Sequence, residues 1–351
     1  MAHIDNQSNR PGGAKLLDVA RTAGCSPATV SRVMNNNPTV GQDVRERVLR
    51  VAAELGYVPN GSARALRSTQ TRLIGAVIPT VDHAIYATMV DGLQTRLGEK
   101  NVSLILSTSM YDLDLEFDQV RLLIEHGVEA VVLVGANHKP QTLALLEQRR
   151  LPYVCTYTAA PTKSGAAIGF DNEKAGRTAA RFLLDLGHRR LGMIAGITQD
   201  NDRAGGRLRG FLDEARKAGI DPTSIPTVEA PYTIGAGAGA MKTLLAQPSQ
   251  PTAVFCGSDI LAAGALRHCT EAHIQVPGAV SVLGFDNLEI AEITAPDLST
   301  LEVPAREMGR LAGDYVLSSS TQRLHLQRTE LPIRLIVRAS TGPAPREPLD
   351  A

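Results

Sequence analysis

The sequence has few cysteines and no long apolar run, and each of these shortages argues against a class of protein. Its four cysteines, spread over 351 residues, show no C-x-x-C spacing, which argues against a disulfide framework and against a zinc ribbon. No apolar stretch approaches the roughly 18 residues of a membrane span. The opening residues, MAHIDNQSNRPGGAK, are polar and lack the apolar segment of a secretory signal, so we expect a cytoplasmic location and no membrane partner.

The balance of 36 basic and 36 acidic residues hides an uneven distribution along the chain. Residues 1–72 contain ten Lys and Arg but only five Asp and Glu, so the remainder carries an excess of five acids. A basic segment joined to an acidic bulk points to a polyanionic partner for the basic end. With 43% hydrophobic and 21% charged residues, the chain otherwise has the composition of a globular protein of two or three domains.

Before residue 70, helical spacing of apolar residues predicts three short helices between Leu16 and Leu55. Gly24 can close the first helix, Ser26 can cap the second, and Gly56 follows the third. Two helices joined by a tight turn, the second of them capped, are typical of a helix-turn-helix. In that motif the second helix enters the major groove of DNA.

The second predicted helix presents side chains that suit contact with DNA. Thr29, Ser31 and Asn35 can donate hydrogen bonds to phosphate. Arg32 can meet guanine or phosphate, and Ala28 is small enough to touch a thymine methyl group. An ordinary helical hairpin with a solvated basic face would show the same pattern, so the turn spacing alone leaves both interpretations open.

After residue 72, short apolar strand candidates alternate with amphipathic helix candidates. Examples are LIGAVIP at 73–79 and AVVLVG at 130–135, each followed by a helical pattern. This alternation predicts βαβ units and parallel sheets. The segment is too long for one open sheet. We therefore predict an α/β fold with two doubly wound lobes that face one another and bind a small ligand at the carboxyl ends of their strands.

Three motifs occur in order: LLDVARTAG from Leu16, SPATVSRVMNN from Ser26, and ELGYVPNGSARAL from Glu54. Together they resemble the DNA-binding head and hinge of the lactose/galactose repressor family of bacterial transcription regulators, and the similarity runs from about Leu16 to Ser340. The resemblance implies a ligand-responsive repressor that binds a near-palindromic operator as a homodimer. It implies no enzyme activity, no cofactor and no metal.

By this resemblance, residues 60–70 form a hinge helix or linker in which Ala63 and Leu66 match a pair that enters the minor groove. A leucine inserted at a base step bends the duplex, although Leu66 could instead be a linker residue packed on the core. Arg64 and Arg67 would face phosphate. The implied DNA-contacting residues are Leu17, Ser26, Ala28, Thr29, Ser31, Arg32, Asn35, Tyr57, Asn60, Ala63, Arg64, Leu66 and Arg67.

The larger part of the chain resembles the periplasmic sugar-binding proteins, in which a small polar effector lies between two lobes. Arg207 matches an arginine that the family aims at effector hydroxyls or carboxylate, unless it pairs with an acid of the protein. Acids, an arginine and an aromatic ring suit a sugar or a sugar acid. The implied effector-binding residues are Ile85, Tyr86, Asp171, Arg207, Tyr232, Ser258, Asp259 and Asp286.

Other roles are open for several of these residues. GFDN occurs twice, each time at the end of a strand pattern, and Asp171 or Asp286 could cap the next helix instead of binding a ligand. Capping is as good an explanation as ligand contact for Ser258 and Asp259. Ile85 stands where the family usually has an aromatic side chain, so a sandwich of two rings around a sugar is not assured.

The predicted organisation is a head at 15–59, a hinge at 60–70, an effector-binding and dimerisation region at 72–340, and a disordered tail at 341–351. Within the third part, the first lobe spans about 72–187 and 303–328, and the second about 188–302 and 329–340. A corepressor-type or activating regulator of the same family is the alternative function. A solute-binding protein would lack the head, and GAGAGA at 235–240 is a poor dinucleotide motif because no clean strand precedes it.

Overall fold

The structure, a computed structural model, describes residues 14–58, 71–160, 165–318 and 328–345. The chain divides into two compact units, residues 1–71 and 72–351. The hinge predicted at 60–70 lies outside the described residues, so its DNA-contacting residues stay a prediction. These are Asn60, Ala63, Arg64, Leu66 and Arg67. No helix in the described ranges is long and apolar enough to cross a membrane.

The first unit is a bundle of three short helices around a small apolar core. Its helices are α1 (Leu16–Thr22), α2 (Pro27–Met34) and α3 (Gln42–Glu54). Helix α2 begins where it does because Ser26 Oγ accepts a hydrogen bond from the backbone N–H of Thr29 at 3.1 Å. Gly24 has a φ of +61°, a conformation that favours glycine, and it closes the turn between α1 and α2.

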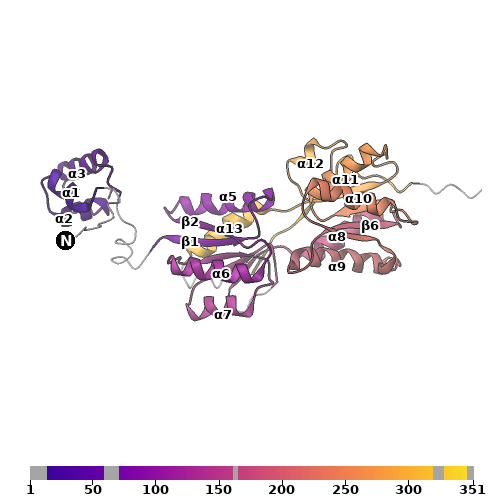
Figure 1. The fold of residues 1–351 in the computed structure, drawn as a ribbon, viewed down its shortest axis with the longest axis horizontal. Coiled ribbons are helices and arrows are strands. Elements are labelled where there is room, and N and C mark those ends of the chain that lie inside the picture. The colour runs from indigo at the N-terminus through magenta and orange to yellow at the C-terminus, as the bar shows by residue number, and fades with distance from the viewer. Residues whose placement is uncertain (1–13, 59–70, 161–164, 319–327, 346–351) are drawn as a thin grey trace, which may run out of the picture. The chain divides into compact units, whose positions relative to one another are not determined.

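The second unit contains two six-stranded sheets, one in each lobe (Figure 1). The first sheet has the strand order β11-β5-β4-β3-β1-β2 and the second β12-β10-β9-β8-β6-β7. The strands of the first sheet are β1 (Leu73–Ile78), β2 (Ser103–Thr108), β3 (Val131–Val134), β4 (Tyr153–Thr156), β5 (Ala166–Gly169) and β11 (Arg328–Glu330). Those of the second are β6 (Leu191–Gly196), β7 (Thr227–Ala230), β8 (Ala253–Cys256), β9 (Ser281–Asp286), β10 (Ser299–Glu302) and β12 (Arg334–Ile336).

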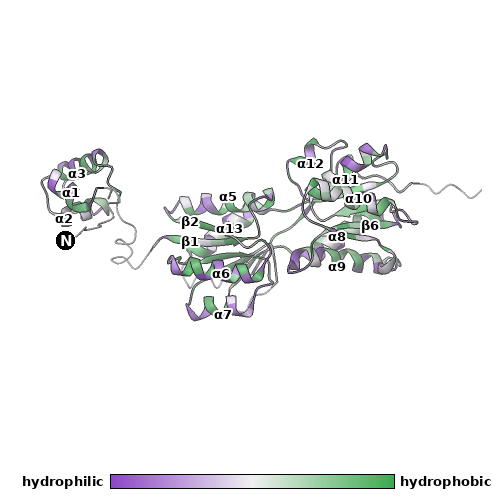
Figure 2. Ribbon diagram, in the orientation of Figure 1, coloured by the Kyte–Doolittle hydropathy of each residue, from purple (hydrophilic) through white to green (hydrophobic). Residues whose placement is uncertain are grey.

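Helices cover the faces of both sheets. They are α5 (Ala84–Gly98), α6 (Leu113–Glu125), α7 (Pro140–Gln148), α8 (Asn172–Asp185), α9 (Asp202–Lys217), α10 (Ile234–Leu245), α11 (Asp259–Glu271), α12 (Ile290–Ile293) and α13 (Ala305–Leu317), with a 3₁₀ turn at Pro222–Ser224. Figure 2 shows the central strands as mainly hydrophobic and the helices as mixed. A strand covered by helices on both faces must be apolar along its length, and β3, β4 and β8 are buried at every residue.

All neighbouring strands of the two sheets pair in parallel except β10 and β12, which pair antiparallel. The predicted pair of doubly wound lobes is therefore confirmed, with one antiparallel edge strand added. Parallel pairing brings the carboxyl ends of the strands to one edge of each sheet. That edge is where the loops that line an interlobe site begin.

Two of the predicted lobe boundaries are wrong. Helix α8 was placed in the first lobe, but it packs on α9 and β8 of the second. The chain therefore crosses between lobes directly after β5 instead of at residue 187. Strand β11 continues to Glu330 beside β5 of the first sheet. The chain therefore passes back to the second lobe after Glu330 instead of after residue 328. Helix α8 follows β5 in the chain but packs on the second lobe, so chain order alone does not assign it to a lobe.

The start of the predicted disordered tail is also too early. The carbonyl of Gly342 accepts a hydrogen bond from the buried ring of His188 at 3.1 Å, and its N–H donates to Ser281 Oγ at 3.0 Å. The N–H of Ala344 donates to the carbonyl of Leu186 at 2.9 Å. These contacts fix residues 342–344 to the second lobe.

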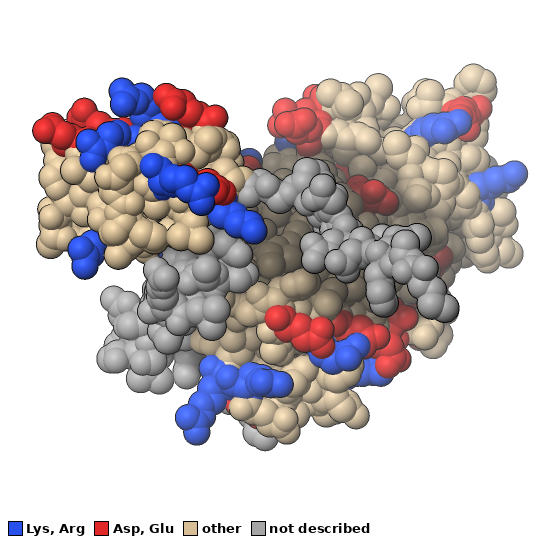
Figure 3. All heavy atoms as spheres, turned by 60° about the vertical axis from the view of Figure 1, so that its left-hand side comes forward, with Lys and Arg blue, Asp and Glu red and all other residues tan. Residues whose placement is uncertain are grey.

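On the surface drawn in Figure 3, Lys and Arg side chains lie beside Asp and Glu side chains. Many exposed pairs are one helical turn apart, such as Arg267 with Glu271 at 2.8 Å. Exposed pairs of this kind contribute little to stability because water and salt screen them.

Helices α8 and α9 approach so closely that glycines are needed where they cross. A Cβ atom added to Gly176 would overlap the carbonyl of Arg207, and one added to Gly210 would overlap the carbonyl of Glu173. The close approach brings Asn172, the first residue of α8, within hydrogen-bond distance of Arg207 on α9. Helix packing therefore sets the position of a buried arginine.

Gly210→Ala should lower the free energy of unfolding by about 1–3 kcal/mol, because the added methyl group meets backbone that cannot move away. Gly239→Ala is the matched control, since Gly239 lies in α10 with open space around it, and alanine favours a helix by about 0.5–1 kcal/mol. Urea unfolding of both variants measures the two changes. Equal effects of the two substitutions would contradict the close approach of α8 and α9.

Candidate functional site

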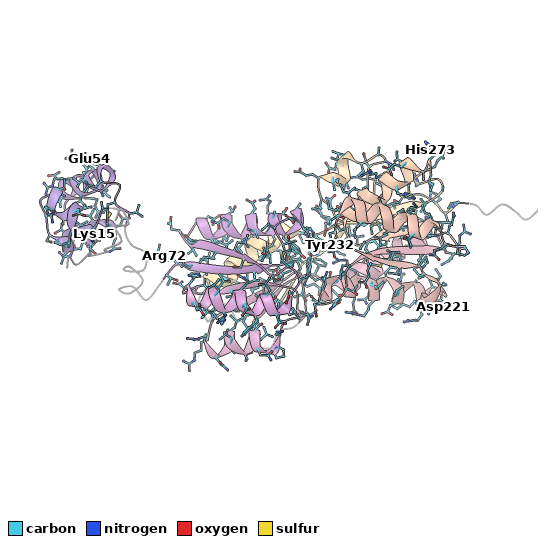
Figure 4. The ribbon with its side chains drawn as sticks, in the orientation of Figure 1. Lys15, Glu54, Arg72, Asp221, Tyr232 and His273 are labelled. Atoms are coloured by element: carbon cyan, nitrogen blue, oxygen red, sulfur yellow. The ribbon has the colours of Figure 1, made fainter. Side chains whose placement is uncertain are left out.

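A cavity lies between the lobes, at the carboxyl ends of strands from both sheets. Figure 4 shows Tyr232 at the junction of the two lobes. Six of the eight residues predicted from the sequence line this cavity: Ile85, Tyr86, Arg207, Tyr232, Ser258 and Asp286. They come from the start of α5 and from the ends of strands β7, β8 and β9, together with α9.

Aromatic rings from both lobes meet at the cavity. The ring of Tyr232 on the second lobe lies 5.1 Å from the ring of His83, edge to face, and 6.5 Å from the ring of Tyr111 in a stacked arrangement. Tyr86 and Tyr157 of the first lobe meet edge to face at 5.3 Å. Ile85 stands where the family usually has an aromatic side chain, but His83 and Tyr111 supply rings opposite Tyr232.

The tyrosine hydroxyls form a short network on the first lobe. Tyr86 and Tyr111 share a hydrogen bond of 3.3 Å, and Tyr111 reaches His83 Nδ1 at 3.2 Å. Tyr157 donates to the carbonyl of Ile85 at 2.7 Å. Burial raises the pKa of Tyr111 and of Tyr157 above the ordinary value, so both hydroxyls keep their protons.

Arg207 is buried in the wall of the cavity, with 7% of its surface exposed. One guanidinium nitrogen donates to Asn172 Oδ1 at 2.8 Å, and a second lies 3.4 Å from the hydroxyl of Tyr232. The guanidinium carbon sits 4.5 Å from the centre of the Phe285 ring, a cation–π contact. Its Nε atom is buried without a hydrogen-bond partner. Among the described residues, no Asp or Glu forms an ion pair with Arg207, which was the alternative role that the sequence left open.

Asp286 ends strand β9 in an unusual backbone conformation, with a φ of +113° that turns the chain at the cavity wall. Burial raises the pKa of its carboxyl well above the ordinary value of 3.8, and the nearby carboxyl of Asp259 raises it further. Arg207 and a hydrogen bond with Ser258 act in the opposite direction. Ser258 also caps α11, because its Oγ accepts from the N–H of Ile260 at 3.2 Å.

Asp171 and Asp259 do not line this cavity, contrary to the prediction. Asp171 caps α8 by accepting from the N–H of Lys174 at 2.9 Å, which is the alternative that the sequence left open. Asp259 is fully buried beneath the cavity wall. It accepts from the N–H of Leu288 at 2.7 Å and from Thr300 Oγ1 at 2.6 Å. It therefore holds the loop after β9 against β10.

The prediction missed several cavity residues, of which His83, Tyr111, Tyr157 and Arg203 matter most. Arg203 precedes Arg207 by one helical turn in the same DRAGGR segment, so helical spacing could have identified it. The three rings follow strand patterns of the first lobe, and their position at strand ends was the available signal.

Two consecutive residues at the start of α9 join the lobes. Asp202 Oδ2 accepts a hydrogen bond from the N–H of Ala136 at 2.9 Å, and Arg203 donates to the carbonyl of Val134 at 3.2 Å. The two side chains also pair with each other at 2.8 Å. We name Asp202 and Arg203 the interlobe clasp. It holds the loop after β3 of the first lobe against the helix that carries Arg207.

In the head, the predicted contact residues lie mainly on the exposed side of α1 and α2. Leu17 is 60% exposed, and Ala28, Arg32 and Asn35 are exposed as well. In the described part of the chain, the side chain of Arg32 forms no hydrogen bond or ion pair, while its carbonyl accepts from the N–H of Asn37. By contrast, Arg45 donates to the carbonyl of Asn37 and so stabilises the loop before α3.

Other predicted residues of the head also have structural roles. Ser26 and Thr29 share a hydrogen bond of 2.9 Å between their hydroxyls at the start of α2. Asn35 Nδ2 donates to the carbonyl of Ser31 at 2.8 Å and closes the end of the same helix. Tyr57 packs on the apolar core of the head, and Ser31 is half-buried. These side chains fix the ends of the helix that exposes Arg32.

Comparison with known proteins gives the same division of the chain. Residues 15–60 match the family described as bacterial regulatory proteins, lacI family, and residues 168–341 match a periplasmic binding protein-like domain. The chain is 31% identical over 335 residues to the HTH-type transcriptional repressor PurR of Escherichia coli, and the alignment covers 95% of this chain and 98% of that protein. It is 28% identical over 327 residues to catabolite control protein A of Priestia megaterium, with 93% and 98% covered. The crystal structure of the Lac repressor dimer bound to operator and the anti-inducer ONPF has a TM-score of 0.83 at 26% identity, covering 94% of this chain and 100% of that one.

Fold, head and cavity together define a DNA-binding transcription regulator with an effector-binding region. The chain belongs to the lacI family of bacterial regulatory proteins and is a transcriptional repressor of that family. The family resemblance, the fold and the class of function inferred from the sequence are thereby confirmed. The match of residues 15–60 to the regulator family excludes the alternative of a solute-binding protein without a head.

Asp286→Asn should raise the melting temperature of the ligand-free protein at neutral pH. Because folding raises the pKa of this carboxyl, ionising it costs stability, and the cost grows as the pH rises above 3.8. The difference in melting temperature between Asp286→Asn and the wild type should therefore become smaller as the pH falls from about 8 to about 5. Thermal unfolding across this range measures it.

Asp221→Asn is the control of opposite sign. A hydrogen bond from the backbone N–H of Thr223 lowers the pKa of Asp221, which is an exposed residue. Its substitution should give no gain in melting temperature at any pH. A constant difference between wild type and Asp286→Asn across the pH range would contradict the raised pKa.

Proposed function

We propose that this repressor works in the cytoplasm as a homodimer on a near-palindromic operator and responds to a sugar or sugar acid bound between its lobes. One helix-turn-helix head covers only a short half-site, so a second copy related by two-fold symmetry would supply the other half. The observation that carries the proposal is a cavity with walls from both lobes, in a chain that also carries an exposed arginine on α2.

We assign the DNA contacts in the described head to its exposed side and to the ends of α2. Arg32 would meet guanine or phosphate, and Ala28 a thymine methyl group. Asn35, Thr29 and Ser31 would donate to phosphate from their positions on the same helix. The full proposed set in the described head is Leu17, Ser26, Ala28, Thr29, Ser31, Arg32, Asn35 and Tyr57.

The proposed mechanism is thermodynamic linkage between the cavity and the operator. A ligand that touches both lobes binds one interlobe arrangement better than others, and it can shift the protein only by that difference in affinity. A change in the interlobe arrangement would affect the interlobe clasp most directly, because Arg203 both lines the cavity and bonds to the other lobe. Coupling between the two sites of about 1–3 kcal/mol would suffice for regulation.

Arg32→Ala should weaken operator binding by about 1–3 kcal/mol and reduce the salt dependence of that binding, because a phosphate or base contact is lost. Arg267→Ala is a control, since Arg267 lies on α11 of the second lobe and is exposed. Titrations of labelled operator at several salt concentrations measure both variants. Unaltered binding by Arg32→Ala, or binding that does not depend on salt, would refute the assignment.

Arg207→Ala and Asp286→Ala should remove the response to effector and leave operator binding intact. The two residues line the cavity from different elements, and neither belongs to the head. The measurement is the ratio of operator affinities with and without the sugar or sugar acid that most raises the melting temperature of the wild type. A normal response in both variants would place the effector elsewhere.

A further inference from the structure

His138 and Glu116 form a buried charged pair in the first lobe, and neither of them lines the cavity. Nδ1 of His138 lies 2.8 Å from Oε1 of Glu116, and the two side chains are 1% and 6% exposed, respectively. Glu116 comes from the first turn of α6, whereas His138 lies in the loop between β3 and α7. The pair therefore joins α6 to the loop that receives the interlobe clasp.

The second ring nitrogen of His138 is bonded as well. Nε2 lies 3.1 Å from the carbonyl oxygen of Gly135 and 3.5 Å from Sγ of Cys155. A carbonyl oxygen can only accept a hydrogen bond, so Nε2 carries a proton, and Nδ1 carries another where it donates to the carboxylate of Glu116. The ring is therefore a cation. Burial lowers the pKa of His138, but its hydrogen bonds with Cys155 and Glu116 outweigh this and raise it to about 10.

Gly135 is the middle one of three residues that meet the second lobe. The carbonyl of Val134 accepts from Arg203 at 3.2 Å, and the N–H of Ala136 donates to Asp202 Oδ2 at 2.9 Å. The carbonyl between them bonds within the first lobe instead, and a φ of +91° at the glycine turns the chain there. The orientation of this one peptide group decides whether its neighbours can reach the interlobe clasp.

Stability alone does not explain a buried charged pair at this position. The loss of hydration offsets much of the attraction between two buried charges, so such a pair contributes little net stability. Two apolar side chains could fill the same space, but they could not bond to the carbonyl of Gly135. What the pair supplies is direction. Glu116 fixes the ring through Nδ1, so that the N–H at Nε2 is aimed at that carbonyl.

We propose that Glu116 and His138 are positioning residues for the interlobe clasp. They hold the carbonyl of Gly135 in the first lobe and thereby present the carbonyl of Val134 and the N–H of Ala136 to the second. A charge on α6, outside the cavity wall, thus sets how firmly the lobes are joined. The inference concerns the protein without a ligand, so it does not rest on the proposed function.

Hydrogen exchange of single backbone amides tests this in the full-length protein. The N–H of Ala136 reports on the clasp, because Ala136 is exposed and the carboxylate of Asp202 is its partner. Asp202→Ala should speed its exchange by about 10- to 100-fold, the loss expected for a hydrogen bond to a charged group. Mass spectrometry with residue-level fragmentation measures the rates. The amides of β8, in the core of the second sheet, show whether the fold is intact.

Glu116→Gln and His138→Gln should each speed exchange of the Ala136 amide by about 10-fold and leave the amides of β8 protected. Each single variant leaves a buried charge without its partner, which can unfold a protein. The double variant Glu116→Leu with His138→Leu avoids this, and it should show the same local effect. Glu125→Gln is the matched control, since Glu125 lies on the same helix and is 60% exposed, and its rates should equal those of the wild type.

Two further readouts separate positioning from a general structural role. Glu116→Gln combined with Asp202→Ala should exchange the Ala136 amide no faster than Asp202→Ala alone, because both changes act on the same bond. Nitrogen NMR of the histidine rings at pH 8 should show both nitrogens of His138 protonated in the wild type. This signature should disappear in Glu116→Gln.

The proposal is overturned if the double leucine variant exchanges the Ala136 amide at the wild-type rate, or if its amides of β8 lose protection too. It is also overturned if Asp202→Ala leaves the rate unchanged, if its effect and that of Glu116→Gln add, or if the ring of His138 is neutral in the wild type at pH 8. Failure of the proposed function would be seen in effector response and operator binding, and it would leave these rates as they are.

Discussion

The interlobe clasp is the contact on which the cavity depends. The walls come from two lobes, and Asp202 and Arg203 join them by bonding to backbone groups of Val134 and Ala136. Because both partners on the first lobe are main-chain groups, the clasp does not depend on the side chains there. Arg203 also lines the cavity, so any ligand that alters its position alters the bond between the lobes.

The loop that receives the clasp is held firmly on its own lobe. Gly135 has a φ of +91°, and a side chain at this position would overlap the guanidinium of Arg203. His138 bonds to the carbonyl of Gly135 at 3.1 Å and to Glu116 at 2.8 Å. Burial lowers the pKa of His138, but hydrogen bonds with Cys155 and Glu116 outweigh this and raise it to about 10. These contacts fix the loop that receives the interlobe clasp to its own lobe.

The repeated GFDN motif shows how far the sequence could predict the site. Caps, strand alternation and the two-lobed fold followed from local patterns, and the resemblance located six of the cavity residues. Identical tetrapeptides nevertheless gave Asp171 and Asp286 different roles. Helix α8 begins directly after Asp171 and takes its carboxylate as a cap, whereas the next helix after Asp286 begins at Ile290 and leaves that carboxyl free to face the cavity. The apolar face of α8 likewise fits either sheet, so local pattern could not place it in a lobe.

Arg207 is positioned by helix packing and not by pairing with an acid, unlike Arg203, which pairs with Asp202. The glycines of α8 and α9 allow the helices to approach until Asn172 reaches Arg207, and this contact orients the guanidinium without neutralising it. An acid at the position of Asn172 would hold the arginine equally well but would cancel its charge. Because an amide stands there, Arg207 keeps its positive charge at the cavity wall.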